Sequence, residues 1–191
     1  MCAYDTRRSY LPLQYASLGP GLAATSMAVS HDSQLLAVAA HANKQNSITL
    51  FSTASLDPVL QWPVAGASVT HLHFMPSGRH VLAVTSEGRL LGLRCSDGGI
   101  DLSVSRAGQC TASALDRSGT HLLTAGADGV LKVWGLHALH QLQQPSEELA
   151  ACQPEASGNS ASSRLGVIRA LPCQEFPGGH AGSVAGMAFL S

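Results

Sequence analysis

The chain has 191 residues, of which 45% are apolar and 12% are charged, and its net charge is −1. This composition excludes a disordered chain, for which low hydrophobicity and high net charge are typical. The chain has only two lysines, Lys44 and Lys132, and between Arg79 and Lys132 six basic residues stand among five acidic ones. This balance excludes a basic stripe of the kind that neutralises nucleic-acid phosphates. No apolar run approaches the length that spans a bilayer, so we expect neither a nucleic-acid nor a membrane partner.

The cysteines indicate a reducing compartment. There are five of them, they form no CxxC pair, and the chain has no Asn-x-Ser/Thr sequence for glycosylation. A secreted disulfide scaffold uses an even number of cysteines at regular spacings. The N-terminal residues also lack the continuous apolar stretch of a signal peptide, so we expect a cytoplasmic protein.

Three stretches of the chain follow one pattern, in which an apolar run, a polar turn and a second apolar run succeed one another. They read AVSHDSQLLAVAA (28–40), HFMPSGRHVLAVTS (73–86) and ALDRSGTHLLTAGA (114–127). The glycines Gly88 and Gly129, in the turns that follow, are 41 residues apart, and so are Leu93 and Trp134. Landmarks that keep one spacing indicate an internal repeat.

The repeat predicts four short strands in each copy. In chain order they fall near 24–29, 35–40, 47–52 and 59–64, then 69–74, 80–85, 89–94 and 100–105, then 110–115, 121–126 and 130–134. The last strand of the third copy lies either before or after an insert at 137–175. Four short strands in each ~42 residues are typical of β-propeller blades. The predicted fold class is therefore all-β, an incomplete propeller of about three and a half degenerate four-stranded blades.

The repeat also divides the chain into domains. Residues 1–23 are an N-terminal segment that supplies an outer strand to a preceding blade, and the blades are 24–66, 67–107 and 108–178, with a fourth beginning at 179–191. A propeller closes with four to eight blades, and an open array leaves unpaired strand edges. We therefore expect the chain to be a fragment or a truncated product of a longer propeller protein.

The third and fourth copies carry the residues of a known family. Over nearly all of its length after the N-terminal segment, the chain resembles WD-repeat β-propellers. The resemblance implies that Thr124, Asp128 and Trp134 hold structural positions of the repeat, as do Gly179 and His180 of the next copy. In that family a Ser or Thr, an Asp, a Trp and a His form one hydrogen-bonded set, and a buried indole N–H needs such an acceptor.

Departures from the family pattern weaken this set. Gly135 follows Trp134 where the family has an Asp, and Gln109 stands where the family has a His. In the second copy Leu93 replaces the Trp. We expect these blades to be held together by apolar packing more than by polar networks.

Two stretches, SALDRSGTHLLTAGADGVLKVWGL and GGHAGSVAGMAFLS, are similar to part of the large multi-propeller WD-repeat proteins of the centriole and cilium. Those proteins associate with the microtubule wall. The resemblance implies a location at the centrosome, the centriole or the base of the cilium. It also implies centriolar or microtubule-associated proteins as partners.

Motifs of enzyme chemistry do not occur in the chain. It contains no GxSxG, no P-loop and no GxGxxG, so we expect no catalytic residue and no cofactor. Cys110 and His121 are candidates for a cross-strand pair, but a buried small cysteine is the favoured interpretation.

The nine histidines predict no metal site. We expect His71 and His73 to point to opposite faces of one strand, so that they do not bind one ion together. We expect His137 and His140 to lie in loop or strand, without a third ligand at a suitable spacing.

These observations favour a non-catalytic scaffold that binds other proteins through the rim or the top surface of a propeller. Two alternatives stay open. One is an enzyme whose polar side chains converge near the central channel, and the other is a binder of the microtubule lattice that acts by charge, which the near-neutral composition disfavours. The insert at 137–175 is the only long break in the repeat, and we interpret it as a mobile loop that carries regulation or partner contact.

Overall fold

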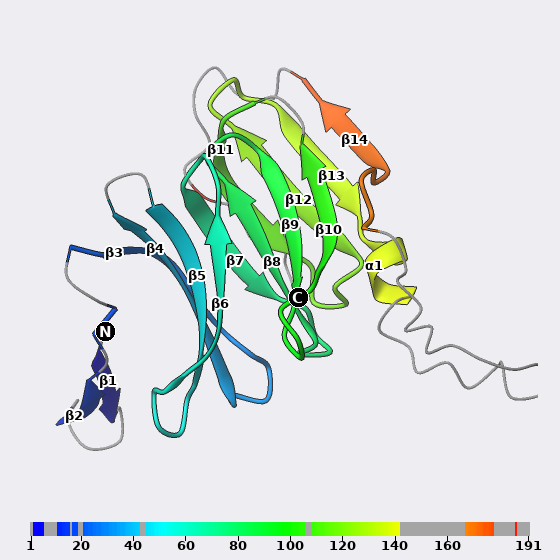
Figure 1. Cartoon of the computed structure of the whole chain (residues 1–191). Coiled ribbons are helices and arrows are strands. Elements are labelled where there is room, and N and C mark those ends of the chain that lie inside the picture. Colours follow the sequence, from blue (N-terminus) through cyan, green and yellow to red (C-terminus); the bar gives the residue numbers. More distant parts are fainter. Residues whose placement is uncertain are drawn as a thin grey trace, which may run out of the picture.

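The structure is a computed structural model that describes residues 2–5, 11–15, 17–18, 21–42, 45–105, 108–141, 167–177 and 186. Within these ranges, three four-stranded antiparallel sheets follow one another along the chain (Figure 1). The first sheet contains β3 (Ala23–Val29), β4 (Leu35–Ala42), β5 (Gln45–Ser52) and β6 (Pro58–Val64). The second sheet contains β7 (Val69–Phe74), β8 (His80–Thr85), β9 (Arg89–Arg94) and β10 (Ile100–Ser105). The third sheet contains β11 (Cys110–Leu115), β12 (His121–Gly126), β13 (Leu131–Gly135) and β14 (Cys173–Phe176).

The all-β fold class and the predicted strand positions are confirmed. In each sheet the strands pair in sequence order, as expected for a propeller blade. The fourth strand of the third sheet comes after the insert, where β14 pairs with β13 and places Cys173 opposite Trp134. The division into blades at the predicted boundaries stays a prediction.

Two expectations about the flanking segments have different outcomes. The start of the insert was expected to be loop or strand, and this is wrong, because His137–Gln141 form a short helix, α1. In the N-terminal segment β2 (Leu11–Tyr15) pairs with β1 (Cys2–Asp5), and its role as the outer strand of a blade stays a prediction. Residues 142–166 of the insert and, apart from Gly186, the predicted fourth copy lie outside the described residues.

The turns between the first two strands of each sheet have the same backbone geometry. Ser30, Met75 and Asp116 each donate a backbone N–H to the carbonyl five residues later. The residue at the tip of each turn has a positive φ, 59° at Ser33, 70° at Gly78 and 73° at Gly119. Gly adopts this conformation without strain, whereas Ser33 is a non-glycine residue that adopts it. These matching turns fix which residues of the three sheets are equivalent.

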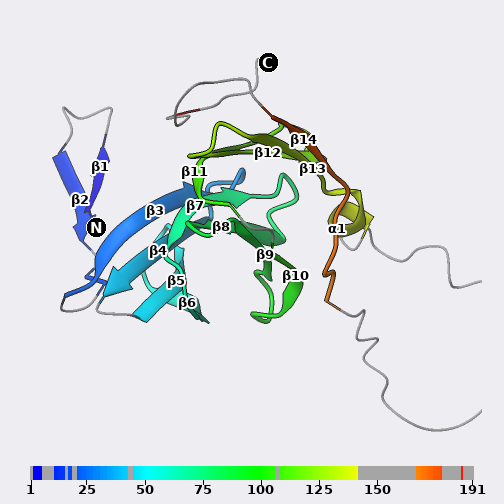
Figure 2. The same cartoon turned by 90° about the horizontal axis from the view of Figure 1, so that it is seen from above.

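The sheets are stacked in chain order, as Figure 2 shows from above. Strand β7 contacts both β3 and β11, so the first strands of the three sheets lie next to one another. The described sheets form an open array, in which the first packs on the second and the second packs on the third.

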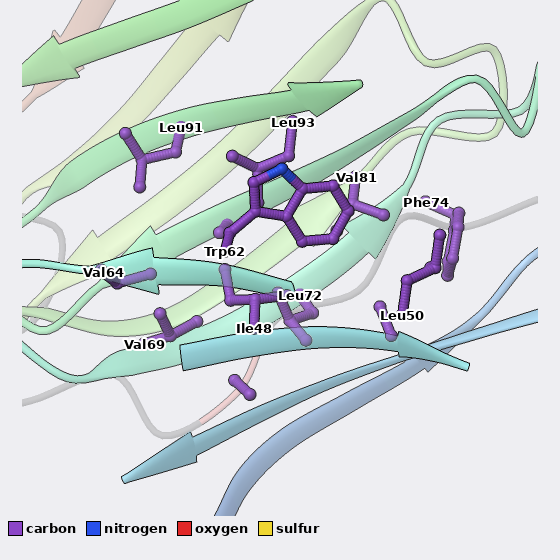
Figure 3. Close-up of a cluster of buried hydrophobic side chains, with 13 residues drawn as sticks. Ile48, Leu50, Trp62, Val64, Val69, Leu72, Phe74, Val81, Leu91 and Leu93 are labelled. Carbon is purple, nitrogen blue, oxygen red and sulfur yellow. The ribbon is translucent and has the colours of Figure 1, made fainter. Parts of the chain in front are cut away.

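The central strand of the second sheet is buried on both faces. All six residues of β8 are buried. Side chains alternate between the faces of a strand, so Val81 and Ala83 join the hydrophobic cluster shared with the first sheet (Figure 3), while Leu82 and Val84 join the cluster shared with the third. The apolar run in this strand therefore serves two interfaces at once.

Candidate functional site

The third sheet places the predicted tryptophan and threonine in contact. Trp134 on β13 is 2% exposed, and its indole Nε1 donates a hydrogen bond of 2.9 Å to Thr124 Oγ1 on β12. The antiparallel register places Trp134 opposite Leu122, two residues from Thr124, so both polar groups lie on one face of the sheet. A buried indole N–H is thereby satisfied.

Asp128 occupies the turn between β12 and β13. Its Oδ1 accepts a hydrogen bond of 3.0 Å from the backbone N–H of Val130. A Cβ at Gly126 would clash with this carboxylate, so glycine at 126 leaves the space into which Asp128 folds. Asp128 is exposed and stabilises its own turn. Gly179 and His180, which the resemblance adds to this set, lie outside the described residues.

A small cavity of about 20 Å³ lies between the second and third sheets, beside this set. Gln109, Thr124, Asp128 and Trp134 are among the residues that line it. Gln109 stands at the position of the family's histidine, and it is exposed. The cavity has room for about one water molecule, well below the volume of a site for an organic substrate.

The second sheet contains a buried polar network that sequence analysis missed. His80 Nε2 lies 2.7 Å from Asp101 Oδ2, and Arg94 Nε donates to the same oxygen at 2.9 Å. Arg94 Nη2 contacts the other oxygen of Asp101, and Arg94 Nη1 lies 2.6 Å from Asp97 Oδ2. His80 is 3% exposed and Asp101 is 6% exposed. The network joins β8, β9 and β10 in the sheet that has Leu93 in place of the Trp.

The contacts within this network favour the ionised form of the Asp101 carboxylate. The hydrogen bond from Arg94 lowers the pKa of Asp101, burial opposes that effect, and the contact with His80 adds to it. The same hydrogen bond raises the pKa of Arg94. His80 Nδ1 is buried and has no hydrogen-bond partner in the described part of the chain.

The expectation for His71 and His73 is wrong. Residues two apart on a strand share a face, and these histidines lie opposite Val84 and Leu82, which both face the third sheet. His73 Nε2 lies 2.7 Å from Ser113 Oγ on β11. Burial, and then the charge of His71, lowers the pKa of His73 to about 4. Among the described residues, no group of three metal-ligating side chains comes together.

The structure does not join Cys110 and His121 as a cross-strand pair. Cys110 lies opposite Gly126 at one end of the β11–β12 pair, and His121 begins β12 at the other end. Burial raises the pKa of the Cys110 thiol, which disfavours the reactive thiolate. The His121 ring instead packs edge-on against His137 of α1, with the ring centroids 5.5 Å apart.

The sequence around Thr124 and Trp134 matches a model of a known protein family. Residues 101–135, which include β10 from Asp101 on and the first three strands of the third sheet, match the family model described as WD domain, G-beta repeat. The chain therefore contains a WD repeat. Thr124 and Trp134 both lie within this repeat, and their hydrogen bond joins β12 and β13, the two middle strands of the third sheet.

This WD-repeat chain is also similar to a protein of the alga Chlamydomonas reinhardtii, "Centriole proteome protein 16". The two are 31% identical over 147 residues, which cover 75% of this chain. The chain spans 7% of the length of that relative. Within the described residues, no helix is long and apolar enough to cross a membrane.

Proposed function

We propose that this chain is part of a non-catalytic protein-interaction scaffold at the centriole or the base of the cilium. The observation that carries the proposal is the similarity to "Centriole proteome protein 16" over 75% of the chain. The proposed blades are residues 24–66, 67–107 and 108–178, and 179–191 begin a fourth. WD-repeat sheets of this kind present edges and turns to partners on a rigid support.

The buried polar groups support a structural use. The indole of Trp134 is engaged by Thr124, and Asp101 is engaged by His80 and Arg94. Each of these contacts holds strands of one sheet together. The cavity beside Trp134 is too small for a substrate. In the other set, both carboxylate oxygens of Asp101 are already engaged by Arg94 and His80.

The proposed partners are other centriolar or microtubule-associated proteins. Contact with the microtubule lattice by charge is not part of the proposal, because 11 basic residues are balanced by 12 acidic ones and the net charge is −1. Salt-sensitive cosedimentation of the chain with tubulin would contradict this point.

The experiment that tests the location is expression of the fluorescently tagged chain in ciliated cells, alongside a centriole marker. We expect the tag to coincide with the marker. The control is Trp134→Ala, which destabilises the third sheet and should lose the coincidence. A tagged chain that stays diffuse, at an expression level where it is folded, contradicts the proposed location.

The insert at 137–175 is proposed to contribute a partner contact. It begins with α1, whose Leu139 is buried in the cluster shared by the second and third sheets, so its start is tied to the fold. Deletion of 144–164 should leave the free energy of unfolding unchanged while reducing labelling of neighbouring proteins in a proximity-biotinylation experiment. If every labelled partner persists after the deletion, the insert has no such role.

A further inference from the structure

A short segment that follows the insert, residues 167–176, contacts the outer edges of two different sheets. Its last part is β14, the outermost strand of the third sheet. Its first part lies beside β10, the outermost strand of the second sheet, where Ile168 forms a parallel bridge with Leu102. Figure 2 shows the segment in orange as it passes from the side of β10 to β14. We call residues 167–176 the strap.

The strap pairs with the second sheet through its main chain. The backbone N–H of Ile168 donates a hydrogen bond of 2.7 Å to the carbonyl oxygen of Asp101. The backbone N–H of Ser103 donates one of 2.8 Å to the carbonyl oxygen of Ile168. These bonds engage polar groups that an edge strand otherwise leaves unpaired. An extended peptide adds to the edge of a sheet through main-chain contacts of this kind.

The strap also forms the outer strand of the third sheet. All four residues of β14 pair with β13, and just before them the backbone N–H of Gly135 donates a hydrogen bond of 2.9 Å to the carbonyl oxygen of Pro172. Lys132 Nζ lies 3.8 Å from Glu175 Oε1, so an acidic side chain of the strap meets a basic side chain of β13. The edge of β13 is therefore a second place where the strap is held.

Between the two edges the strap buries one aliphatic side chain. Leu171 is 5% exposed and belongs to the hydrophobic cluster shared by the second and third sheets. Ile168 packs against the same cluster, whereas Arg169 and Ala170 are exposed. In strand addition, main-chain pairing supplies affinity, and side chains seated among the residues of the acceptor supply specificity. Leu171 is the side chain of the strap that is seated in this way.

The two ends of the insert are fastened near one another by separate contacts. Leu139 of α1 is fully buried in the cluster that also contains Leu102. A Cβ at Gly92 of β9 would meet both of these leucines, so α1 packs beside β9 and β10. Leu102 is also the residue that Ile168 pairs with. Because each end has its own contacts with the sheets, neither end needs the connection through residues 142–166 to stay in place.

We propose that the outer edges of β10 and β13 form a binding site for an extended peptide, and that the strap docks there as a ligand, independently of the chain that leads to it. The site recognises a main chain that pairs with both edges, an aliphatic side chain at position 171 and an acidic side chain opposite Lys132. The insert is then a tether, which can be cut or engaged by a partner without opening the third sheet. Docking of the strap does not depend on the proposed location at the centriole.

The test separates the strap from the rest of the chain. A recognition sequence for a site-specific protease replaces residues 151–157, and a second one is inserted after Pro177. Cleavage of the folded chain then turns the strap into a separate peptide. Size-exclusion chromatography at micromolar concentration removes unbound peptide, and mass spectrometry measures how much of the strap stays with the sheets. We expect the strap with the natural sequence to stay bound.

Substitutions in the strap test the contacts that hold it. Leu171→Asp should lower the retained amount at least about tenfold, because a charge replaces a buried aliphatic side chain. Ile168→Pro removes the N–H that donates to Asp101 and should also lower it, and this variant decides the outcome if Leu171→Asp loses its sheets before cleavage. The matched control is Ala170→Asp, which places the same charge at an exposed neighbouring position and should keep the natural level. Far-ultraviolet circular dichroism before cleavage checks the sheets of each variant.

Two results would overturn the proposal. Loss of the natural strap from the sheets after cleavage would show that only its covalent connection holds it there. Retention of the strap at the natural level in both Leu171→Asp and Ile168→Pro would show that the edge of β10 and the buried leucine are not its binding site.

Discussion

The indole Nε1 of Trp62, on the last strand of the first sheet, donates a hydrogen bond of 2.8 Å to the carbonyl oxygen of Gly98. Gly98 lies in the turn between β9 and β10 of the second sheet and has a φ of 76°. Trp62 is 5% exposed and stands among the apolar side chains that both sheets contribute (Figure 3). The Trp62 side chain thus contributes both buried apolar area and a hydrogen bond to the interface between the first and second sheets.

Substitution of Trp62 should separate these two contributions. Trp62→Phe loses the donor and leaves the Gly98 carbonyl without it, at a cost of about 1–2 kcal/mol in the free energy of unfolding. Trp62→Ala also leaves a cavity and should cost about 3–5 kcal/mol. Urea unfolding followed by circular dichroism measures both. Equal losses in the free energy of unfolding for the two variants would show that the buried area of the side chain has no role at this interface.

The contact between Thr124 and Trp134 should appear as a coupling energy. Thr124→Val and Trp134→Phe each remove one partner of a buried hydrogen bond and should each cost about 1–2 kcal/mol. The double variant should cost less than the sum of the single variants by about 0.5–1.5 kcal/mol. A double-mutant cycle from urea unfolding tests this, and strict additivity would show that the two side chains do not interact.

Asp101 should contribute more to stability than its neighbour Asp97, although both contact Arg94. Asp101→Asn weakens charge-assisted hydrogen bonds in a buried network and should cost about 1–3 kcal/mol. Asp97→Asn changes an exposed ion pair that water screens, so it should change the free energy of unfolding much less than Asp101→Asn does. The pKa of Asp101 is lowered in the folded protein, mainly by Arg94, so its stabilisation is present above its ordinary pKa and is lost as the pH falls through the folded-state pKa. Thermal unfolding of both variants near neutral pH should show the larger loss of stability for Asp101→Asn. At acidic pH the difference between the two variants should shrink.

His73 should make the fold sensitive to mild acid. Its pKa falls from 6.5 to about 4 in the folded protein, chiefly through burial, so the unfolded chain binds the proton more readily. The stability is complete above pH 6.5 and decreases as the pH falls toward 4, by at most about 3 kcal/mol. His73→Gln should flatten this decrease, whereas His31→Gln, at an exposed position, should not. Unfolding curves at closely spaced pH values measure the slope.

Much of the fold could be predicted because its determinants are local. Strand positions follow from alternating apolar residues between turns with Gly78 or Gly119, and those turns repeat along the chain. The helix α1 was missed, although Leu136 and Leu139 have the three-residue spacing of one helical face and are both buried. In so short a segment, this spacing does not distinguish a helix from a loop.

Of the two polar sites, one could be predicted from the sequence and the other could not. The contact between Thr124 and Trp134 could be expected from the family pattern. The network of Asp101 could not, because the register of β9 and β10 shifts between Ile100 and Leu102, and Asp101 lies at that irregularity. A bulge turns a side chain out of strict alternation, so the sequence pattern alone does not reveal that Asp101 reaches His80.

Native-state amide hydrogen exchange tests the central claim, that the chain folds as three stacked four-stranded sheets. The second sheet is covered on both faces, so amides of β8 should be the slowest to exchange in the described part of the chain. Amides of β3, an edge strand whose side chains are mostly exposed, should exchange sooner. This order is the predicted result. Exchange of β8 as fast as that of β3 would contradict the stacked arrangement.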